Sequence, residues 1–189
     1  MGEENVIPKN NLAGLEKELL AFKESFLTNL NASNEKLKIL SDELFDLRVT
    51  LMPIIIKANG LSNCIQQLIN KMNSECTFYT NLNNSYTDYT FNLLTEIHIY
   101  AIIEEALLNV KKHSNAQSAI VMIAPLEKAI IVQISDNGKG FDVMQILKSG
   151  KAKGLLGIEK RCREMETSTS IQSEFGNTNI LIEIPFKHV

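Results

Sequence analysis

The sequence has few cysteines, no long apolar run and no marked excess of charge of either sign. Its three cysteines, Cys64, Cys76 and Cys162, are odd in number and widely spaced, which argues against both a disulfide framework and a zinc site. No apolar stretch approaches the roughly 20 residues that a membrane span needs, and the N-terminus lacks a signal-peptide core. We therefore expect a cytoplasmic chain with free thiols.

The charges are balanced and dispersed. The chain has 19 basic and 22 acidic residues, for a formal net charge of -3, and its lysines do not cluster. Nothing in this pattern favours nucleic acid or an anionic membrane as the main partner. With 189 residues, of which 44% are hydrophobic, the chain can bury one good core. We expect one globular domain with an appendage and no nucleic-acid partner.

The N-terminal region carries a long helical pattern. Leucine and phenylalanine recur at spacings of three and four between Leu12 and Leu51, which is typical of a coiled-coil seam. Residues 31–34, Asn-Ala-Ser-Asn, allow either a stutter in one long helix or a tight turn between two helices. Because so long an apolar stripe needs a partner, we expect residues 1–57 to form a dimerising stalk. The alternative is a helix packed on its own globular domain.

A change of pattern after Pro53 and Gly60 predicts a domain over residues 58–189. We expect an α/β domain of the α+β type, a two-layer sandwich in which a mixed, largely antiparallel sheet packs on helices. The expected helices span residues 61–72, 91–113 and 155–165. The expected strands span residues 76–80 (an edge strand), 118–124, 129–135, 170–173 and 180–186, with loops over 81–90 and 141–153.

Two segments of this domain carry candidate chemistry. In a helix over residues 91–113, Glu105, Asn109 and Lys112 fall on one edge, about 120° round from an apolar stripe. The turn at residues 136–140, Asp-Asn-Gly-Lys-Gly, follows an expected strand. Its glycines therefore lie where the backbone bends sharply or a ligand comes close. Helix edge and glycine turn together suggest a nucleotide site.

Three short segments resemble a known family. Glu-Ala-Leu-Leu-Asn-Val-Lys-Lys-His at 105–113 resembles the N box of histidine-kinase ATP-binding domains, Asp-Asn-Gly-Lys-Gly-Phe-Asp at 136–142 the G1 box, and Gly-Leu-Leu-Gly-Ile at 154–158 the G2 box. The resemblance covers about residues 60–187 and is greatest to sensor kinases that pair with LuxR-type response regulators. It implies a Bergerat-type fold, shared with gyrase and the heat-shock chaperone.

The resemblance implies ATP and Mg²⁺ as cofactors. By this resemblance Asn109 would ligate Mg²⁺, Lys112 would meet phosphate, and Glu105 would orient or deprotonate the attacking group. Asp136 would accept a hydrogen bond from the exocyclic amine of adenine, with Thr178 helping to bind the base. The alternatives are a solvated lysine, a surface carboxylate and an aspartate that only shapes a turn.

The remaining implied contacts to the nucleotide come mostly from glycines. Gly138 and Gly140 would let the backbone approach the purine, and the G2 segment would open a helix whose free amides hold phosphate oxygens. That segment contributes Gly154, Leu155 and Gly157. Ala152 stands where the family often has a glycine, which predicts a stiffer lid. We expect His113, which lies further round the helix, to be structural.

Histidine is scarce, and its positions matter. The family phosphorylates a histidine on the first dimerisation helix, but the three histidines here are His98, His113 and His188. We therefore expect the ATP-binding catalytic domain of a two-component sensor histidine kinase. It would donate the γ-phosphoryl group to a histidine outside this chain, in a parent kinase that a membrane segment could anchor. The implied partners are a histidine-bearing dimerisation domain, a LuxR-type response regulator and a second copy of the chain.

Two other classes of protein stay open. One is an inactive, nucleotide-sensing module that signals through lid closure and helical dimerisation. The other is an interaction module whose stalk dimerises and whose ATPase fold is a degenerate scaffold. Phosphoryl transfer to a histidine-bearing fragment separates the first alternative from a kinase, and absence of Mg·ATP binding would indicate the second.

Overall fold

The computed structural model describes residues 9–84, 91–149 and 152–186. The chain divides into two compact units, Met1–Thr50 and Leu51–Val189. Within the described residues, no helix is both long enough and apolar enough to cross a membrane.

The described residues of the first unit are helical. Helix α1 (Lys9–Asn59, 51 residues) passes through residues 31–34 without a break, so the continuous helix is the correct one of the two alternatives. Pro53 lies inside α1 and does not end it. The helix ends at Asn59, and Gly60 follows at φ 77°, a backbone conformation that glycine adopts without steric cost.

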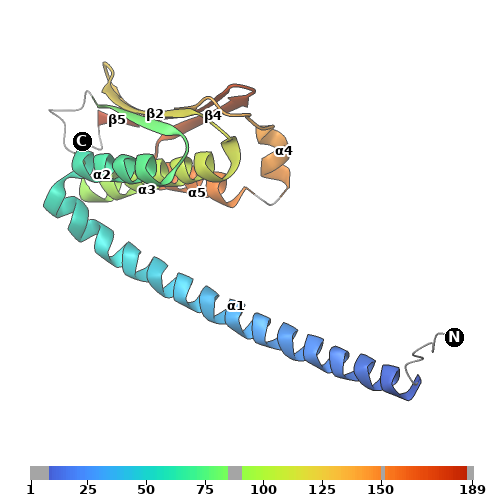
Figure 1. Ribbon diagram of the computed structural model, residues 1–189. Helices are drawn as coiled ribbons and strands as arrows, with labels where there is room; N and C mark the ends of the chain where they lie inside the picture. The colour runs from blue at the N-terminus through green and yellow to red at the C-terminus, as the bar shows by residue number, and fades with distance from the viewer. Residues whose placement is uncertain (1–8, 85–90, 150–151, 187–189) are drawn as a thin grey trace. The chain divides into compact units, whose positions relative to one another are not determined.

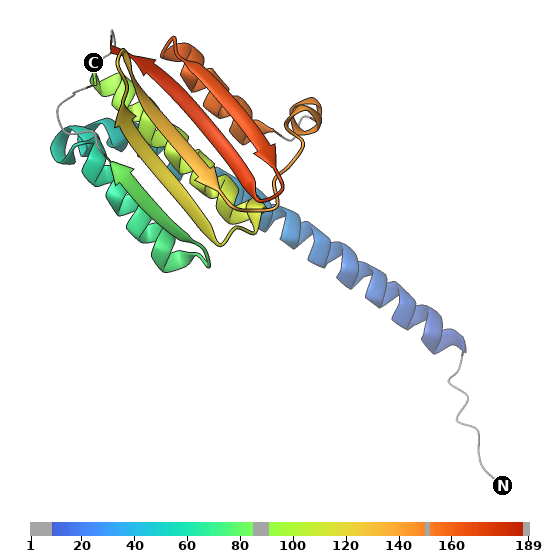
Figure 2. The ribbon, with the colours of Figure 1, turned by 90° about the horizontal axis from the view of Figure 1, so that it is seen from above.

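The second unit contains a five-stranded sheet with the strand order β1-β2-β3-β5-β4 (Figures 1 and 2). Strand β1 pairs with β2 in parallel, and the other neighbours are antiparallel, as predicted for a mixed, largely antiparallel sheet. The hairpin of β2 and β3 lies inside the sheet, with Ala119 opposite Asp136. The strands are β1 (Tyr79–Asn84), β2 (Ser118–Pro125), β3 (Ala129–Asp136), β4 (Ser168–Glu174) and β5 (Asn177–Pro185).

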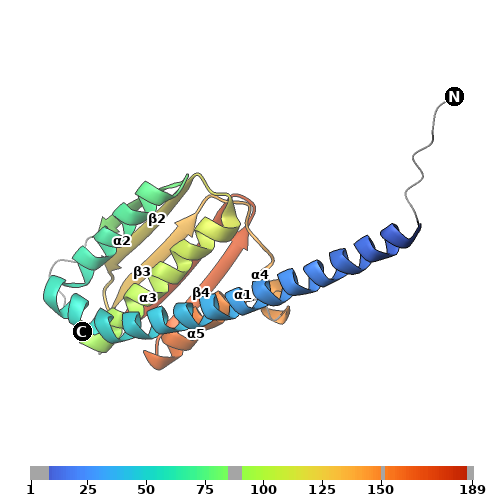
Figure 3. The same cartoon turned by 60° about the horizontal axis from the view of Figure 1, so that its bottom comes forward.

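Three helices cover one face of the sheet, which gives the two-layer α+β sandwich expected from the sequence (Figures 1 and 3). They are α2 (Leu61–Glu75), α3 (Leu93–Asn109) and α5 (Lys153–Glu164). The predicted apolar stripe of α3 is buried, with Ile99 and Ile103 at 0% exposure. Each such side chain contributes about 1.5–3 kcal/mol through burial. The side chain of Asn92 accepts the Thr95 N–H at 3.0 Å and so fixes where α3 begins.

The edge strand differs from its prediction. It was expected at residues 76–80, but β1 begins at Tyr79 and continues to Asn84 through residues expected to be loop. Parallel pairing with β2, from Tyr79 opposite Ser118 to Asn84 opposite Ile123, overrides the low strand propensity of asparagine. The Asn73 amide also bonds the N–H and C=O of Thr80, at 2.6 and 2.9 Å.

The loop expected at residues 141–153 contains a short helix, α4 (Val143–Lys148). Asp142 caps it by accepting the Gln145 N–H at 2.9 Å, so the prediction of a loop was wrong over these residues. The next helix, α5, begins at Lys153.

Candidate functional site

A cavity of about 400 Å³ lies between the C-terminal end of α3, the glycine-rich loop after β3 and the start of α5. This volume is within the range of small-molecule sites. The fold thus brings the three resembling segments to one place. Six of the predicted site residues line the cavity: Asn109, Asp136, Gly140, Gly154, Leu155 and Thr178.

Asp136 is the last residue of β3 and is only 8% exposed. Burial raises the pKa of its carboxyl group, although the Gly138 N–H and the hydroxyls of Thr178 and Ser114 act in the opposite direction. The Gly138 N–H donates to Oδ1 at 2.9 Å and so fixes the orientation of the carboxyl group. A fixed acceptor on a mostly buried wall suits a ligand that presents an amine.

The glycine-rich loop is held on the side of α3. Gly138 does not line the cavity, and a Cβ atom there would lie 2.6 Å from the Cβ of Ser114. The Lys139 N–H donates to the Ser114 carbonyl at 2.8 Å. Gly138 therefore allows close packing of the loop against the end of α3, and its predicted approach to a purine stays a prediction.

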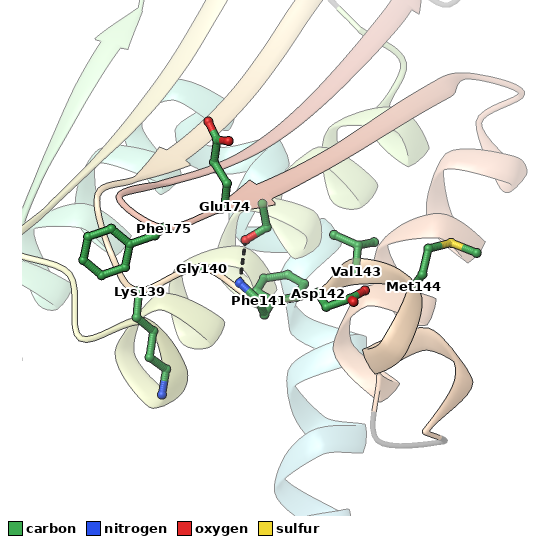
Figure 4. Close-up of a pocket in the computed structure, with 9 residues that line it drawn as sticks. Lys139, Gly140, Phe141, Asp142, Val143, Met144, Glu174 and Phe175 are labelled. Carbon is green, nitrogen blue, oxygen red and sulfur yellow. Dashed lines mark hydrogen bonds between the residues drawn. The ribbon is translucent and has the colours of Figure 1, made fainter.

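The tip of the β4–β5 hairpin holds the same loop from the other side. Gly140, at φ 65°, packs on the carbonyl of Glu174, and the Phe141 N–H donates to Ser173 Oγ at 3.0 Å (Figure 4). A second hollow of about 540 Å³ opens between hairpin tip and loop, and Phe175 and Met144 lie on its wall. The segment Lys139–Phe141 lines both hollows, so hairpin and helix together fix its backbone.

Glu105 and Asn109 meet the first turn of α5. Gly154 packs directly on Glu105 Oε1, and a Cβ atom at Gly154 would lie 3.1 Å from Asn109 Nδ2. Nδ2 is buried and has no hydrogen-bond partner among the described residues, which is costly for an amide group. Ala152, the residue before α5, offers no side-chain cap, so the first amides of that helix are suited to an anion. Glu105 itself does not line the cavity.

The donor set suits a magnesium nucleotide. Mg²⁺ takes oxygen ligands and commonly binds through one or two protein groups together with phosphate oxygens and water. The described residues contain no cluster of three or more His, Cys, Asp or Glu side chains that could hold a metal alone. With Asn109 as a ligand, an Mg²⁺ ion would take its other ligands from the nucleotide and water, and this role of Asn109 stays a prediction.

The C-terminal end of α3 differs from the predicted regular helix. It continues into a π-helical turn, Val110–Ser114, and there His113 lines the cavity whereas Lys112 is exposed and does not line it. A π turn contains more than four residues, so the fourth residue after Asn109 returns to the side of Asn109 and the third does not. The position of His113 on the wall was not predicted, because the sequence has no periodic signal for the π turn. The expectation that His113 is structural stays a prediction.

Gly157 also lies off the cavity, one turn into α5. A Cβ atom there would lie 3.1 Å from the guanidinium of Arg161, which donates to the Gly157 carbonyl at 3.0 Å. The predicted contacts of Gly157 and Lys112 with the nucleotide therefore remain predictions.

Proteins similar to this chain in sequence include sensor histidine kinases, although no family model matches the chain. The chain is 27% identical over 126 residues to the sensor histidine kinase ComP of Bacillus subtilis strain 168, covering 67% of this chain and 16% of ComP. It is 35% identical over 92 residues to the histidine-protein kinase/phosphatase DegS of the same strain, covering 48% of this chain and 24% of DegS. It is 24% identical over 164 residues to the oxygen sensor histidine kinase NreB of Staphylococcus carnosus strain TM300, covering 86% of this chain and 47% of NreB. The chain thus spans less than half the length of each of these relatives.

Solved structures match the fold. The Acinetobacter baumannii histidine kinase AdeS aligns with a TM-score of 0.59 and 13% identity, over 79% of this chain and 80% of that one. The histidine kinase domain of the blue-light activated kinase from Erythrobacter litoralis EL346 aligns with a TM-score of 0.55 and 17% identity, over 68% of this chain and 60% of that one. The chain is therefore homologous to sensor histidine kinases, and its second unit has the fold of their catalytic domains.

Proposed function

We propose that Leu51–Val189 binds Mg·ATP and donates the γ-phosphoryl group to a histidine of a dimerisation domain. One observation carries this proposal: the buried carboxyl of Asp136 and the unpartnered amide of Asn109 belong to a single cavity. The first group suits an adenine amine. In the second, the unpartnered Nδ2 suits a phosphate oxygen, and Oδ1 is the atom that would ligate Mg²⁺.

The walls suggest how each part of the nucleotide is held. Ile134, Leu155 and Ile180 give the purine an apolar surface next to the acceptor Asp136. The first amides of α5 face an anion favourably because of the helix dipole. Mg²⁺, when bound, neutralises phosphate charge. Glu105 lies beside Asn109 at Gly154, within the region where an attacking imidazole would need to be oriented.

The partners follow from the same proposal. The acceptor histidine would come from a dimerisation domain, the final recipient would be a LuxR-type response regulator, and two copies of the chain would associate through the helical stalk. The family resemblance supports the regulator, and the exposed stripe on α1 supports the dimer.

The proposal predicts a specific loss in Asn109→Ala. The magnesium-dependent part of ATP affinity should disappear, because the amide oxygen supplies a metal ligand, while ATP binding in EDTA should stay nearly unchanged. Titration calorimetry with and without Mg²⁺ measures both quantities. Asn63→Ala, which removes an exposed amide on α2, serves as the matched control. Equal losses with and without metal would show that the substitution damages the helix and would contradict the metal role.

The stalk predicts self-association. The apolar side chains of α1 that the structure describes between Leu19 and Leu51 are exposed, among them Phe22 at 69% and Phe26 at 58%, whose rings stack with centroids 6.5 Å apart. We expect the chain to sediment as a dimer and Phe22→Asp/Phe26→Asp to sediment as a monomer, because charge at a coiled-coil seam opposes pairing. A double variant that stays dimeric in sedimentation equilibrium would refute a dimer formed by this stripe.

A further inference from the structure

Three polar side chains form a row across neighbouring strands of the sheet. Strand pairing places Asp136 of β3 opposite Thr178 of β5, and Thr178 opposite Ser173 of β4. Because directly opposed residues of paired strands project to the same face of a sheet, the three side chains lie side by side on one face. Asp136 and Thr178 are each 8% exposed and line the cavity, whereas Ser173 lines the second hollow and not the cavity. The row thus runs from the buried acceptor to the edge strand.

The donors and acceptors of this row fix where its hydrogen atoms point. The Phe141 N–H, which can only donate, donates to Ser173 Oγ at 3.0 Å (Figure 4). The hydroxyl oxygens of Ser173 and Thr178 lie 2.9 Å apart. The Thr178 hydroxyl also bonds the Asp136 carboxyl group and opposes the rise in its pKa that burial causes. Since an ionised carboxylate only accepts, the Thr178 hydrogen is used there, and Ser173 is the donor to Thr178.

This direction of donation leaves only acceptors facing the base. Thr178, with its hydrogen bonded to Asp136, offers a ligand oxygen lone pairs, as the carboxylate does. Such a wall accepts a hydrogen bond from an exocyclic amine and disfavours a carbonyl oxygen at the same position of the base. Donation by Ser173 occupies one lone pair of Thr178 Oγ1 and so fixes the rotation of that hydroxyl. Without this donor, the hydroxyl would be free to turn its hydrogen toward a ligand carbonyl.

The Ser173 hydroxyl is not what joins the hairpin to the glycine-rich loop. The Gly176 N–H donates to the Gly138 carbonyl at 2.8 Å, and this bond involves no side chain. Removing the Ser173 hydroxyl therefore leaves hairpin and loop connected. The loss is confined to the donor for Thr178 and the acceptor for the Phe141 N–H.

We infer that Ser173 is a positioning residue that sets the preference of the cavity for adenine over a purine with a carbonyl oxygen at C6. This assignment rests on the proposed ATP site and adds a determinant of its base specificity. Ser173 acts through Thr178, because it does not itself line the cavity.

The test compares ATP with inosine triphosphate (ITP), which carries a carbonyl oxygen where adenine has its exocyclic amine. In Ser173→Ala, affinity for Mg·ATP should fall about fivefold, the loss expected for one hydrogen bond, while affinity for Mg·ITP should stay unchanged or rise. Ser173→Thr keeps the hydroxyl and should retain the wild-type preference. Ser173→Cys, a similar shape with a weaker donor, should show a smaller loss in the same direction. Calorimetry measures each affinity, and circular dichroism of each full-length variant confirms that it is folded.

The matched control is Ser170→Ala, which removes an exposed hydroxyl from the same strand and should leave both affinities unchanged. Equal losses for ATP and ITP in folded Ser173→Ala would show a merely structural role and overturn the assignment. Wild-type affinities for both nucleotides in that variant would overturn it as well, and in either case the ATP site would stand. A wild-type chain that binds neither nucleotide, or binds both equally, would overturn the proposed adenine site and this inference with it.

Discussion

Asp136→Asn should weaken ATP binding by about 5- to 150-fold, which corresponds to the roughly 1–3 kcal/mol cost of an unmet hydrogen-bonding group on a buried wall. The substitution preserves size, and Asn can still accept the Gly138 N–H that fixes the side chain. Its NH₂ group, however, would face the adenine amine with a donor where the ligand needs an acceptor. Calorimetry with ATP measures the loss directly.

The stability of the same variant should change in the opposite direction. Burial raises the pKa of Asp136 in the folded chain, so the protonated form stabilises the fold below the unfolded pKa. That contribution is lost as pH rises through the folded pKa, and at neutral pH the wild type holds a desolvated charge. The neutral amide removes this cost. We therefore expect an unfolding free energy at pH 7 equal to or above that of the wild type, and a smaller difference in acid.

The ATP affinity and the unfolding free energy of Asp136→Asn serve as controls for each other. A variant that lost ATP affinity because it misfolded would also lose unfolding free energy in urea. Loss of affinity with retained or raised stability identifies Asp136 as a ligand-binding group that is kept at a cost to the apo fold. Wild-type affinity in a folded Asp136→Asn chain would contradict the adenine assignment.

The parts of the fold that follow a simple period were predictable. The apolar stripe of α3 and the alternation of β2 and β3 depend only on local spacing, and Ile103 and Val132 are fully buried as such spacing requires. Helix α4 could also have been predicted from the sequence. Asp142 followed three residues later by Gln145 is a capping pattern that predicts a helix start, but it was read as part of a loop.

Other features depend on tertiary contacts that a local pattern does not contain. The three asparagines of β1 are poor strand formers, and they are extended because β2 supplies parallel hydrogen-bond partners. The π turn after Asn109 changes which side chain returns to the cavity, so a regular helical wheel did not show that His113 lies on the wall. The contact of Lys112 with the nucleotide stays a prediction. Asp136 and Asn109 could be placed on the cavity wall from the sequence because both precede these irregular segments.

Phosphoryl transfer requires a nucleophile in line with the leaving oxygen, opposite the ADP that departs. A P–O bond to ADP breaks, a P–N bond to an imidazole forms, and the imidazole proton passes to a base, for which Glu105 is the candidate. His98 lies on the same helix as Glu105, two turns earlier, and is only 14% exposed. His113 lies on the cavity wall, one turn after Asn109, and His188 lies outside the described residues.

This chain alone, incubated with labelled Mg·ATP, should therefore bind the nucleotide without forming acid-labile phosphohistidine. When a fragment of a related sensor kinase supplies the histidine-bearing dimerisation hairpin, the label should appear on that fragment. In Glu105→Gln the transfer rate should fall by about 10²-fold or more, which is the usual contribution of a general base, while ATP affinity stays within about twofold. Glu104→Gln, at the adjacent carboxylate, should transfer at nearly the wild-type rate.

Each result has a distinct meaning. Label on one of the chain's own histidines, mapped by mass spectrometry under alkaline conditions, would contradict the requirement for an outside acceptor. ATP binding without transfer to any supplied histidine fragment would favour the nucleotide-sensing module over the kinase. Equal losses of transfer in Glu104→Gln and Glu105→Gln would remove Glu105 from the chemistry. Its contact with Gly154 would then be packing at the start of α5.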